Sequence, residues 1–152
     1  MAARLILTNE DCYGYKYDDV HIVMQGTDGN LTASVTYNFM APEAGDIVDA
    51  VLGVTNGADG TDPLNLELDV QINGTSCFTT KPKIDKTAGT GWKTTVASGT
   101  GITVGSLDTA KVAAARGDKI TIVLTLVRTT PETESSDPAA IVTMRFSKGS
   151  TP

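Results

Sequence analysis

The sequence predicts an all-β fold, a two-layer antiparallel β-sandwich with an N-terminal arm, and three observations support this prediction. Residues 64–72 alternate between large aliphatic and polar residues, the period of a strand with one buried and one solvated face. Asn73-Gly74 follows at once, and this dipeptide favours the type I′ turn of a hairpin. Similar alternating runs recur along the 152 residues, separated by segments rich in Gly, Pro, Asn and Asp. Each aliphatic row needs an opposing sheet to exclude water, so two packed layers are expected.

The first part of the chain is expected to hold an irregular segment, a hairpin and one further strand. Residues 1–19 do not alternate cleanly, so they form either an arm packed on a neighbouring subunit or an edge strand folded on its own domain. Residues 20–25 and 31–39 are predicted to pair as a hairpin, and residues 47–55 form the next strand. In the arm interpretation, apolar, aromatic and basic residues make the contact: Arg4, Leu5, Ile6, Leu7, Tyr13, Tyr15 and Tyr17.

The segment after the Asn-Gly turn is less regular. Residues 76–79 are the predicted partner of the central strand, and Pro82 restricts the residues after it to an edge or a loop. Residues 84–101 are rich in Thr, Gly, Ala and Lys, with Trp92 as their one large anchor. Residues 107–116 form either one or two helical turns or a short strand and its connection.

Two further strands complete the predicted domain. Residues 119–128 alternate strongly, and residues 139–146 form the last strand after an acidic loop. The expected organisation has three parts: an arm or edge segment over residues 1–19, a single β-sandwich domain over residues 20–146, and a flexible tail over residues 147–152.

Composition and charge exclude several classes of function. The formal net charge is -6 and no run of basic residues exists, so nucleic acid is not an expected partner. The apolar stretch at the N-terminus is too short for a signal peptide or a membrane span, so the chain is expected to be made in a cytoplasm and to have no membrane partner. Cys12 and Cys77 are too few for a disulfide framework; two reduced thiols are expected, with a single bridge as the alternative.

The residues that carry chemistry in enzymes are sparse and scattered. His21 is the only histidine, so a zinc site with several imidazoles cannot be built, and no Ser-His-Asp arrangement is expected. Glu67 and Asp69 lie two apart on the central strand and offer a carboxylate pair for glycoside hydrolysis. Their face is the polar one by the alternation, so a solvated sheet face is the simpler interpretation. No catalytic residue and no cofactor is therefore expected.

Three further features each have a structural explanation. Asn56, Asp59 and Asp62 are oxygen donors in one loop, but their spacing does not match a calcium loop, so turn chemistry explains them and no metal site is expected. Arg116-Gly117-Asp118 spells a tripeptide recognised by integrins, and a turn that starts the next strand explains it. Trp92 offers a surface for stacking on a sugar ring, or else closes the end of the sandwich.

The region from residue 44 to residue 146 resembles a β-sandwich module of tailed-bacteriophage virion proteins, such as capsid decoration and head-fibre proteins. Four segments carry the resemblance in order: residues 44–50, 68–76, 79–85 and 115–122. The resemblance implies a jelly-roll-like sandwich, no enzyme activity and assembly on a virus particle, commonly as trimers. The long segment before residue 44 and the irregular stretch near Trp92 depart from the simplest form of this pattern.

The expected function rests on this resemblance together with the sparse chemistry. The chain is expected to be a noncatalytic virion structural protein, a capsid decoration protein that binds the outer surface of the shell. Its expected partners are the major capsid protein and two further copies in a homotrimer, and its expected location is the capsid surface after synthesis in the host bacterial cytoplasm. The alternative is a receptor- or carbohydrate-binding module of a tail or head appendage. A glycosidase that uses Glu67 and Asp69 is the third hypothesis.

Overall fold

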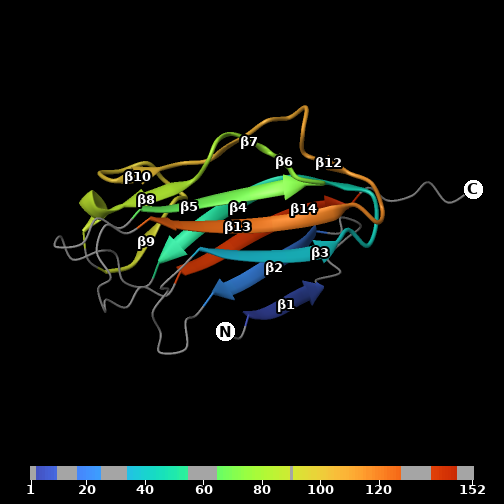
Figure 1. Ribbon diagram of the computed structural model, residues 1–152, viewed down its shortest axis with the longest axis horizontal. Helices are drawn as coiled ribbons and strands as arrows, with labels where there is room; N and C mark the ends of the chain where they lie inside the picture. Colours follow the sequence, from blue (N-terminus) through green and yellow to red (C-terminus); the bar gives the residue numbers. More distant parts are fainter. Residues whose placement is uncertain are drawn as a thin grey trace, which may run out of the picture.

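The fold is a two-layer antiparallel β-sandwich, which confirms the predicted fold class (Figure 1). The computed structural model describes residues 3–9, 17–24, 34–54, 65–89, 91–127 and 138–146. The first sheet has the order β1 (Ala3–Asn9), β2 (Tyr17–Met24), β14 (Pro138–Phe146), β4 (Gly45–Val54) and β12 (Ala113–Ala114), and β9 (Lys93–Thr94) also pairs with β4. The second has the order β10 (Ile102–Thr103), β8 (Lys83–Asp85), β5 (Asn65–Ile72), β13 (Lys119–Val127) and β3 (Val35–Met40), and β6 (Thr75–Ser76) also pairs with β5.

Three short elements lie outside these sheets. β7 (Phe78–Thr80) and β11 (Ser106–Leu107) pair with each other in a small separate sheet. A 3-10 helix, η1 (Lys86–Ala88), follows β8, and the carboxylate of Asp85 caps its start by accepting a hydrogen bond from the backbone N–H of Thr87. No helix in the described part of the chain has the length and apolar character needed to cross a membrane.

The connectivity is that of a jelly roll. The core of one sheet has the order β2-β14-β4-β12 and that of the other β3-β13-β5-β8. Strands that follow one another along the chain therefore lie in opposite layers: β2 and β3, β3 and β4, β4 and β5, and β13 and β14. This alternation between layers is the double Greek-key arrangement of a jelly roll.

The predicted hairpin between residues 20–25 and 31–39 is wrong. β2 pairs with β1 and β14 in the first sheet, whereas β3 pairs with β13 in the second. The alternation of residues in each strand is correct, but it records which face is buried and not which strand is the neighbour. The suggested helical turns over residues 107–116 are also absent, since this segment contains β11 and β12.

The turn of the central hairpin is confirmed, but its second strand is shorter than the predicted residues 76–79: β6 ends at Ser76, and β7 pairs with β11. Asn73 and Gly74 have φ angles of 51° and 86°, the two positive values of a type I′ turn. The turn sets the register of β5 with β6, in which Ile72 pairs with Thr75 and Gln71 with Ser76.

The core lies between the two sheets and is mainly aliphatic. Its largest fully buried side chains come from β4, β5, β8 and β13: Ile47, Leu52, Leu66, Leu68, Ile84, Ile120, Ile122 and Leu124. Burying a side chain of this size stabilises a fold by about 1.5–3 kcal/mol, so these residues dominate the packing energy. Tyr37 and Phe39 on the edge strand β3 are half-buried against this core.

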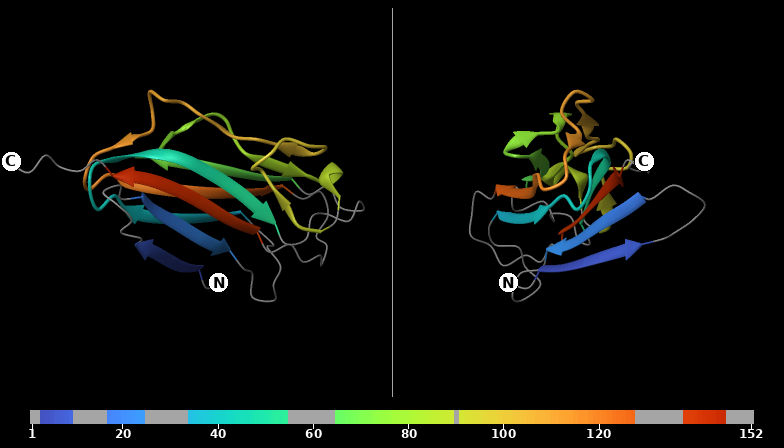
Figure 2. Two further views of the ribbon diagram at one scale, coloured as in Figure 1. Left: turned by 180° about the vertical axis from the view of Figure 1, so that it is seen from behind. Right: turned by 90° about the vertical axis from the view of Figure 1, so that its right-hand side faces the viewer.

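The first sheet reaches past the second on one side of the sandwich. β1 is its last strand there, and β1 lies beyond β3 in the view of Figure 1 and in the right-hand view of Figure 2. On the opposite side, β9, β10 and β12 are edge strands of two residues each. The two sides of the molecule therefore differ in the length of their edge strands.

Candidate functional site

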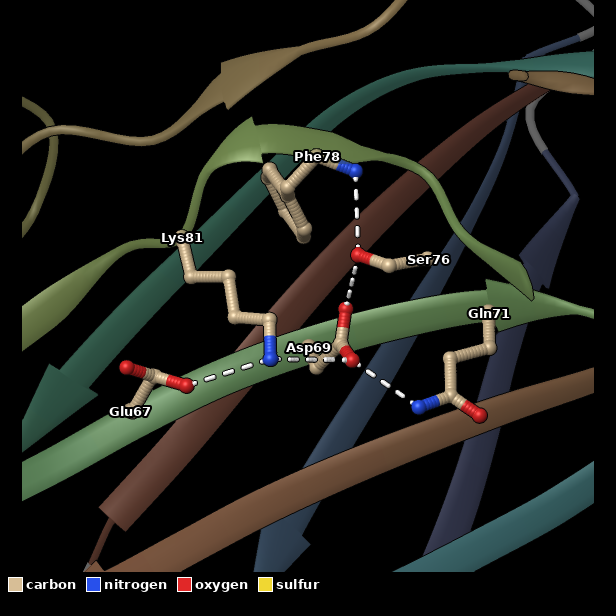
Figure 3. A network of polar contacts seen from close by, with 6 residues as sticks. All are labelled: Glu67, Asp69, Gln71, Ser76, Phe78 and Lys81. Atoms are coloured by element: carbon tan, nitrogen blue, oxygen red, sulfur yellow. Dashed lines mark hydrogen bonds and ion pairs between the residues drawn. The ribbon is translucent and has the colours of Figure 1, made fainter. Parts of the chain in front are cut away.

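The main polar cluster of the described chain surrounds Asp69 on the outer face of β5 (Figure 3). One carboxylate oxygen of Asp69, Oδ1, accepts a hydrogen bond of 2.6 Å from the hydroxyl of Ser76. Its other oxygen, Oδ2, accepts a hydrogen bond of 2.9 Å from Nε2 of Gln71 and lies 3.3 Å from Nζ of Lys81. Lys81 also pairs with Oε1 of Glu67 at 3.2 Å, so one ammonium group joins both carboxylates.

An arch of chain covers this cluster. After β6 the chain rises over β5 and returns as β8, and Phe78 lies on the arch above Asp69 (Figure 3). The backbone N–H of Cys77 donates to Val70 at one end of the arch, and the carbonyl of Pro82 accepts from Leu68 at the other. The hydroxyl of Ser76 accepts a further hydrogen bond from the N–H of Phe78. The arch is thus fixed to β5 by backbone bonds and by the carboxylate beneath it.

The expectation that Glu67 and Asp69 share a solvated face is wrong for Asp69. The side chain of Glu67 is 41% exposed, but Asp69 as a whole is only 5% exposed. Alternation along β5 predicts which side of the sheet Asp69 occupies, but it carries no information about chain that folds back over that side. Buried carboxylates need donors: Ser76 ends β6 just before the arch, and Lys81 lies at the far end of the arch.

Charge and burial shift two titrating groups beside Asp69. Burial alone lowers the pKa of Lys81, but the hydrogen bonds and charges of Glu67 and Asp69 outweigh burial, so the pKa of Lys81 lies above its ordinary value. Burial raises the pKa of the Cys77 thiol from 9.0 to about 11, and the negative charge of Asp69 adds to the effect. Cys77 is a free thiol with no exposed surface, whereas Cys12 lies outside the described residues.

The contacts of Asp69 suit a structural role, in which its carboxylate holds the arch on β5, better than the role of a catalytic acid or base. A glycosidase needs a carboxylate that faces substrate and a second carboxyl group that gives up a proton. Both oxygens of Asp69 already accept hydrogen bonds or an ion pair from the protein, and the arch covers them. Among the described residues, no group of three or more His, Cys, Asp or Glu side chains is placed to hold a metal ion. Asn56, Asp59 and Asp62 lie outside the described part.

A second polar cluster joins three turns at one end of the sandwich. Oδ1 of Asp118 accepts a hydrogen bond of 2.8 Å from Nδ2 of Asn73, and Oδ2 accepts one of 2.8 Å from the backbone N–H of Ala115. Oδ1 of Asn73 in turn accepts from the N–H of Lys119 at 2.9 Å. The carbonyl of Asp118 accepts a hydrogen bond from Ala41, which follows β3. These bonds tie the ends of β3, β5 and β13 together.

The Arg116-Gly117-Asp118 tripeptide is therefore part of a turn before β13, as the structural interpretation holds. Gly117 has a φ of 92°, which favours glycine. The Asp118 carboxylate, which an integrin would have to bind, is engaged by Asn73 and Ala115. The hydrogen bond from Asn73 and that from the Ala115 N–H hold the pKa of Asp118 below its ordinary value.

Trp92 is a surface residue. It is 60% exposed, so it does not close the end of the sandwich. The six-membered part of its indole lies against Gly53 of β4, where an added Cβ would come within 3.2 Å of the ring. Val96, on the same segment, is 72% exposed.

The predicted contact residues of the N-terminal segment fall into three groups. Arg4, Leu5, Ile6 and Leu7 lie in β1, which forms seven register pairs with β2 and so belongs to the first sheet. Tyr17 is the first residue of β2, and His21 lies in the middle of β2 with Ile6 and Ile141 as its register partners. Tyr13 and Tyr15 lie outside the described residues.

Sequence reasoning missed the partners of Asp69. The contact with Ser76 is predictable from the sequence, because a two-residue turn at Asn73-Gly74 fixes the pairing of Gln71 with Ser76. That pairing places Ser76 diagonally across from Asp69. The contact with Lys81 is not predictable from the sequence, because the path of the arch, and not strand register, brings Lys81 to Asp69.

Comparisons with known proteins add a single distant likeness. No family model matches the chain, and no curated protein matches it. One similar solved structure is a native family 35 carbohydrate binding module from Clostridium thermocellum, at 14% sequence identity and a TM-score of 0.32. The match covers 95% of this chain and 88% of that one. A similarity of this size carries no conclusion about ligand or partner.

Proposed function

We propose that this protein is a noncatalytic structural protein of a tailed-phage particle, a decoration protein that binds the major capsid protein on the outer surface of the shell. The observation that carries the proposal is the ordered set of four segments that resemble the virion module. They supply β4, the β5–β6 hairpin, β7 with β8, and the start of β13, so the resemblance extends over both sheets. In this role the protein has no cofactor and acts at the capsid surface.

Adhesion, and not bond-making, is the proposed mechanism. In the described part of the chain, the candidate carboxylate pair and the Asp118 turn are both engaged in internal contacts, which favours a rigid scaffold over a reactive site. A scaffold of this kind presents surface to several shell subunits, and multivalent attachment strengthens contacts that are individually weak. A homotrimer suits the local three-fold positions of a shell by closed symmetry.

Electron microscopy of phage particles with and without the protein tests this proposal. We expect density on the outer surface at regular lattice positions, in hundreds of copies, and binding of the purified protein to bare shells. Density confined to a tail or to a few head appendages would contradict decoration and would support the appendage alternative. Failure to bind bare shells of the parent phage would contradict it as well.

A second candidate function, binding of carbohydrate, is favoured by one observation. Trp92 keeps most of its large apolar side chain in solvent while Gly53 supports part of the ring, and exposed aromatic rings of this kind stack on sugar faces. Trp92 is the only tryptophan of the chain, so its fluorescence reports on this site alone. A titration with surface glycans of the host that shifts this fluorescence, together with loss of glycan binding in Trp92→Ala but not in Val104→Ala, would support it. An unchanged spectrum throughout a glycan panel would reject it.

A further inference from the structure

Gly53 lies on the outer face of β4 and is nevertheless buried. Its neighbours along the strand, Leu52 and Val54, are fully buried in the core, so alternation places Gly53 on the opposite face. The atoms nearest to the Cβ that Gly53 lacks are Cη2 and Cζ2 of Trp92, at 3.2 and 3.4 Å, followed by the carbonyl oxygen of Lys93 at 3.7 Å. The indole of Trp92 therefore occupies the space that a side chain at residue 53 would fill.

The segment that carries Trp92 is fixed to β4 by strand pairing and by a buried threonine. In the pairing of β9 with β4, Thr94 is the register partner of Gly53. Oγ1 of Thr95 accepts a hydrogen bond of 2.9 Å from the N–H of Leu52, and the N–H of Thr95 donates one of 2.9 Å to the carbonyl of Leu52. Thr95 itself is buried. Folding therefore orders the backbone beside Trp92, and a ligand at the ring does not have to bear that entropic cost.

Trp92 differs from the other exposed apolar side chains. Among the described residues, five large hydrophobic side chains are exposed, and Trp92 is the only aromatic one; the others are Met40, Val48, Val96 and Val104. The core does not use the Trp92 side chain, which is 60% exposed. The support from Gly53 thus holds an aromatic ring in place while most of its surface stays in contact with solvent.

The size of the exposed ring and the charge of the chain indicate the class of ligand. Burying a whole tryptophan covers about 150–250 Å², whereas a stable protein interface buries about 800 Å² on each partner. One supported ring is therefore a small part of a protein interface, but it matches one face of a single pyranose, where C–H groups form an apolar surface. The net charge of -6 disfavours anionic sugars such as uronic acids, so a neutral sugar fits best.

We propose that Gly53 positions Trp92 as a rigid platform for the apolar face of a neutral pyranose. This inference rests on the second candidate function, the binding of carbohydrate, and adds a positioning residue and a ligand class to it. Gly53 acts through Trp92, because the indole lies over it and separates it from the ligand. A side chain at residue 53 would displace the ring and remove the order on which tight stacking depends.

Gly53→Val tests the support of the ring in the absence of ligand. Its control is Asp49→Val, which puts the same side chain at an exposed position of β4. Time-resolved fluorescence anisotropy measures the local motion of the ring, because Trp92 is the only tryptophan. We expect little fast motion in the natural protein and in Asp49→Val, and a clear fast component in Gly53→Val. Equal decays in all three proteins would overturn the positioning role. If Gly53→Val does not fold, Gly53→Ala, whose Cβ comes within 3.2 Å of the ring, makes the same comparison.

Titration of the same variants with sugars tests the ligand class. The probes are cellulose and mannan oligomers and their uronate counterparts, glucuronan and mannuronan, which have the same rings and linkages. We expect a neutral oligomer to shift the Trp92 fluorescence, the uronates to leave it unchanged, and Gly53→Val to bind about tenfold more weakly than Asp49→Val. Equal binding by these two variants, or an equal response to the uronates, would overturn the inference and leave carbohydrate binding standing. A protein that responds to no oligomer but binds host surface glycans would overturn the ligand class, and one that binds neither would overturn the second candidate function as well.

Discussion

Three side chains that look reactive in the sequence are used by the fold. The carboxylate of Asp69 holds an arch of chain, the carboxylate of Asp118 joins the turn at Asn73 to the turn before β13, and the thiol of Cys77, at the start of the arch, is buried in the hydrophobic core. The two carboxylates accept hydrogen bonds from donors within the protein, and the thiol is surrounded by apolar side chains. Their contribution is therefore expected in stability measurements, and Asp118 and Cys77 each allow a specific prediction.

The first prediction concerns acid stability. The Asp118 pKa is lowered in the folded state, so its contribution is complete above the ordinary value of 3.8 and is lost as the pH falls through the lower folded value. Asp118→Asn should lower the melting temperature at neutral pH and weaken the loss of stability below about pH 4. Thermal melts between neutral and acid pH measure this, with Glu43→Gln as a control for the loss of an exposed charge. Equal acid dependence in Asp118→Asn and the natural protein would show that the turn does not depend on this carboxylate.

The second prediction concerns Cys77. With a pKa of about 11 and no exposed surface, the thiol should react slowly with a thiol reagent at pH 8 until urea unfolds the protein. The folded state keeps the proton longer than the unfolded state, so stability should fall as the pH rises from 9.0 toward about 11, by roughly 3 kcal/mol at most. Both measurements are made in a Cys12→Ser background, with Cys77→Ala as the control that loses the alkaline dependence. Rapid labelling of the native protein would refute the buried position of this thiol.

At the scale of elements, the β5–β6 hairpin and the arch after it form one unit. The type I′ turn sets the register, the register brings Ser76 to Asp69, and Asp69 then holds the arch that carries Lys81 back to the same strand. A change in the turn should therefore affect contacts well beyond it.

Gly74→Ala tests the turn itself. No atom lies within 4 Å of an added Cβ, so steric contact is not the issue, and the cost arises from the positive φ of 86°. We expect a loss of about 1–2 kcal/mol in the free energy of unfolding, measured by urea denaturation. Gly74→Asn should lose less, because asparagine tolerates this conformation better than alanine. Equal losses for the two variants would argue against backbone strain as the cause.

Substitutions of Asp69 and of Lys81 are predicted to lower the free energy of unfolding by unequal amounts. Asp69→Ala leaves the half-buried hydroxyl of Ser76 without its acceptor and should cost about 1–3 kcal/mol. Lys81→Met removes a side chain that is 37% exposed, so solvent and salt screen the pair and the loss should be smaller, about 1 kcal/mol or less. Urea unfolding at low and high salt measures both, with the exposed Glu43→Gln as a control outside the cluster. A larger loss of stability for Lys81→Met than for Asp69→Ala would contradict the conclusion that Asp69 holds the arch on β5.

At the scale of the whole molecule, the edge strands differ between the two sides of the sandwich: β1 and β3 have seven and six residues, whereas β9, β10 and β12 have two each. The net charge of -6 opposes non-specific association of free copies, so we expect any self-association to need a specific surface. Deleting residues 1–17 removes β1 and should leave a folded sandwich, seen by circular dichroism and a cooperative melt, that neither self-associates nor binds shells. The natural protein is the control in the same assays. A truncated protein that keeps both properties would contradict the role of this segment.

The sequence by itself determined the two buried faces, the central hairpin with its Asn73-Gly74 turn, and the sandwich that must enclose the aliphatic rows. These features arise from a period of two and from backbone preferences, which are local properties of the chain. Tertiary structure alone decided that β2 and β3 lie in different layers, that Asp69 is covered, and that β1 extends past β3. Alternation indicates only whether a residue faces the core. It does not indicate which strand pairs with a given strand, or which segment of chain covers its outer face.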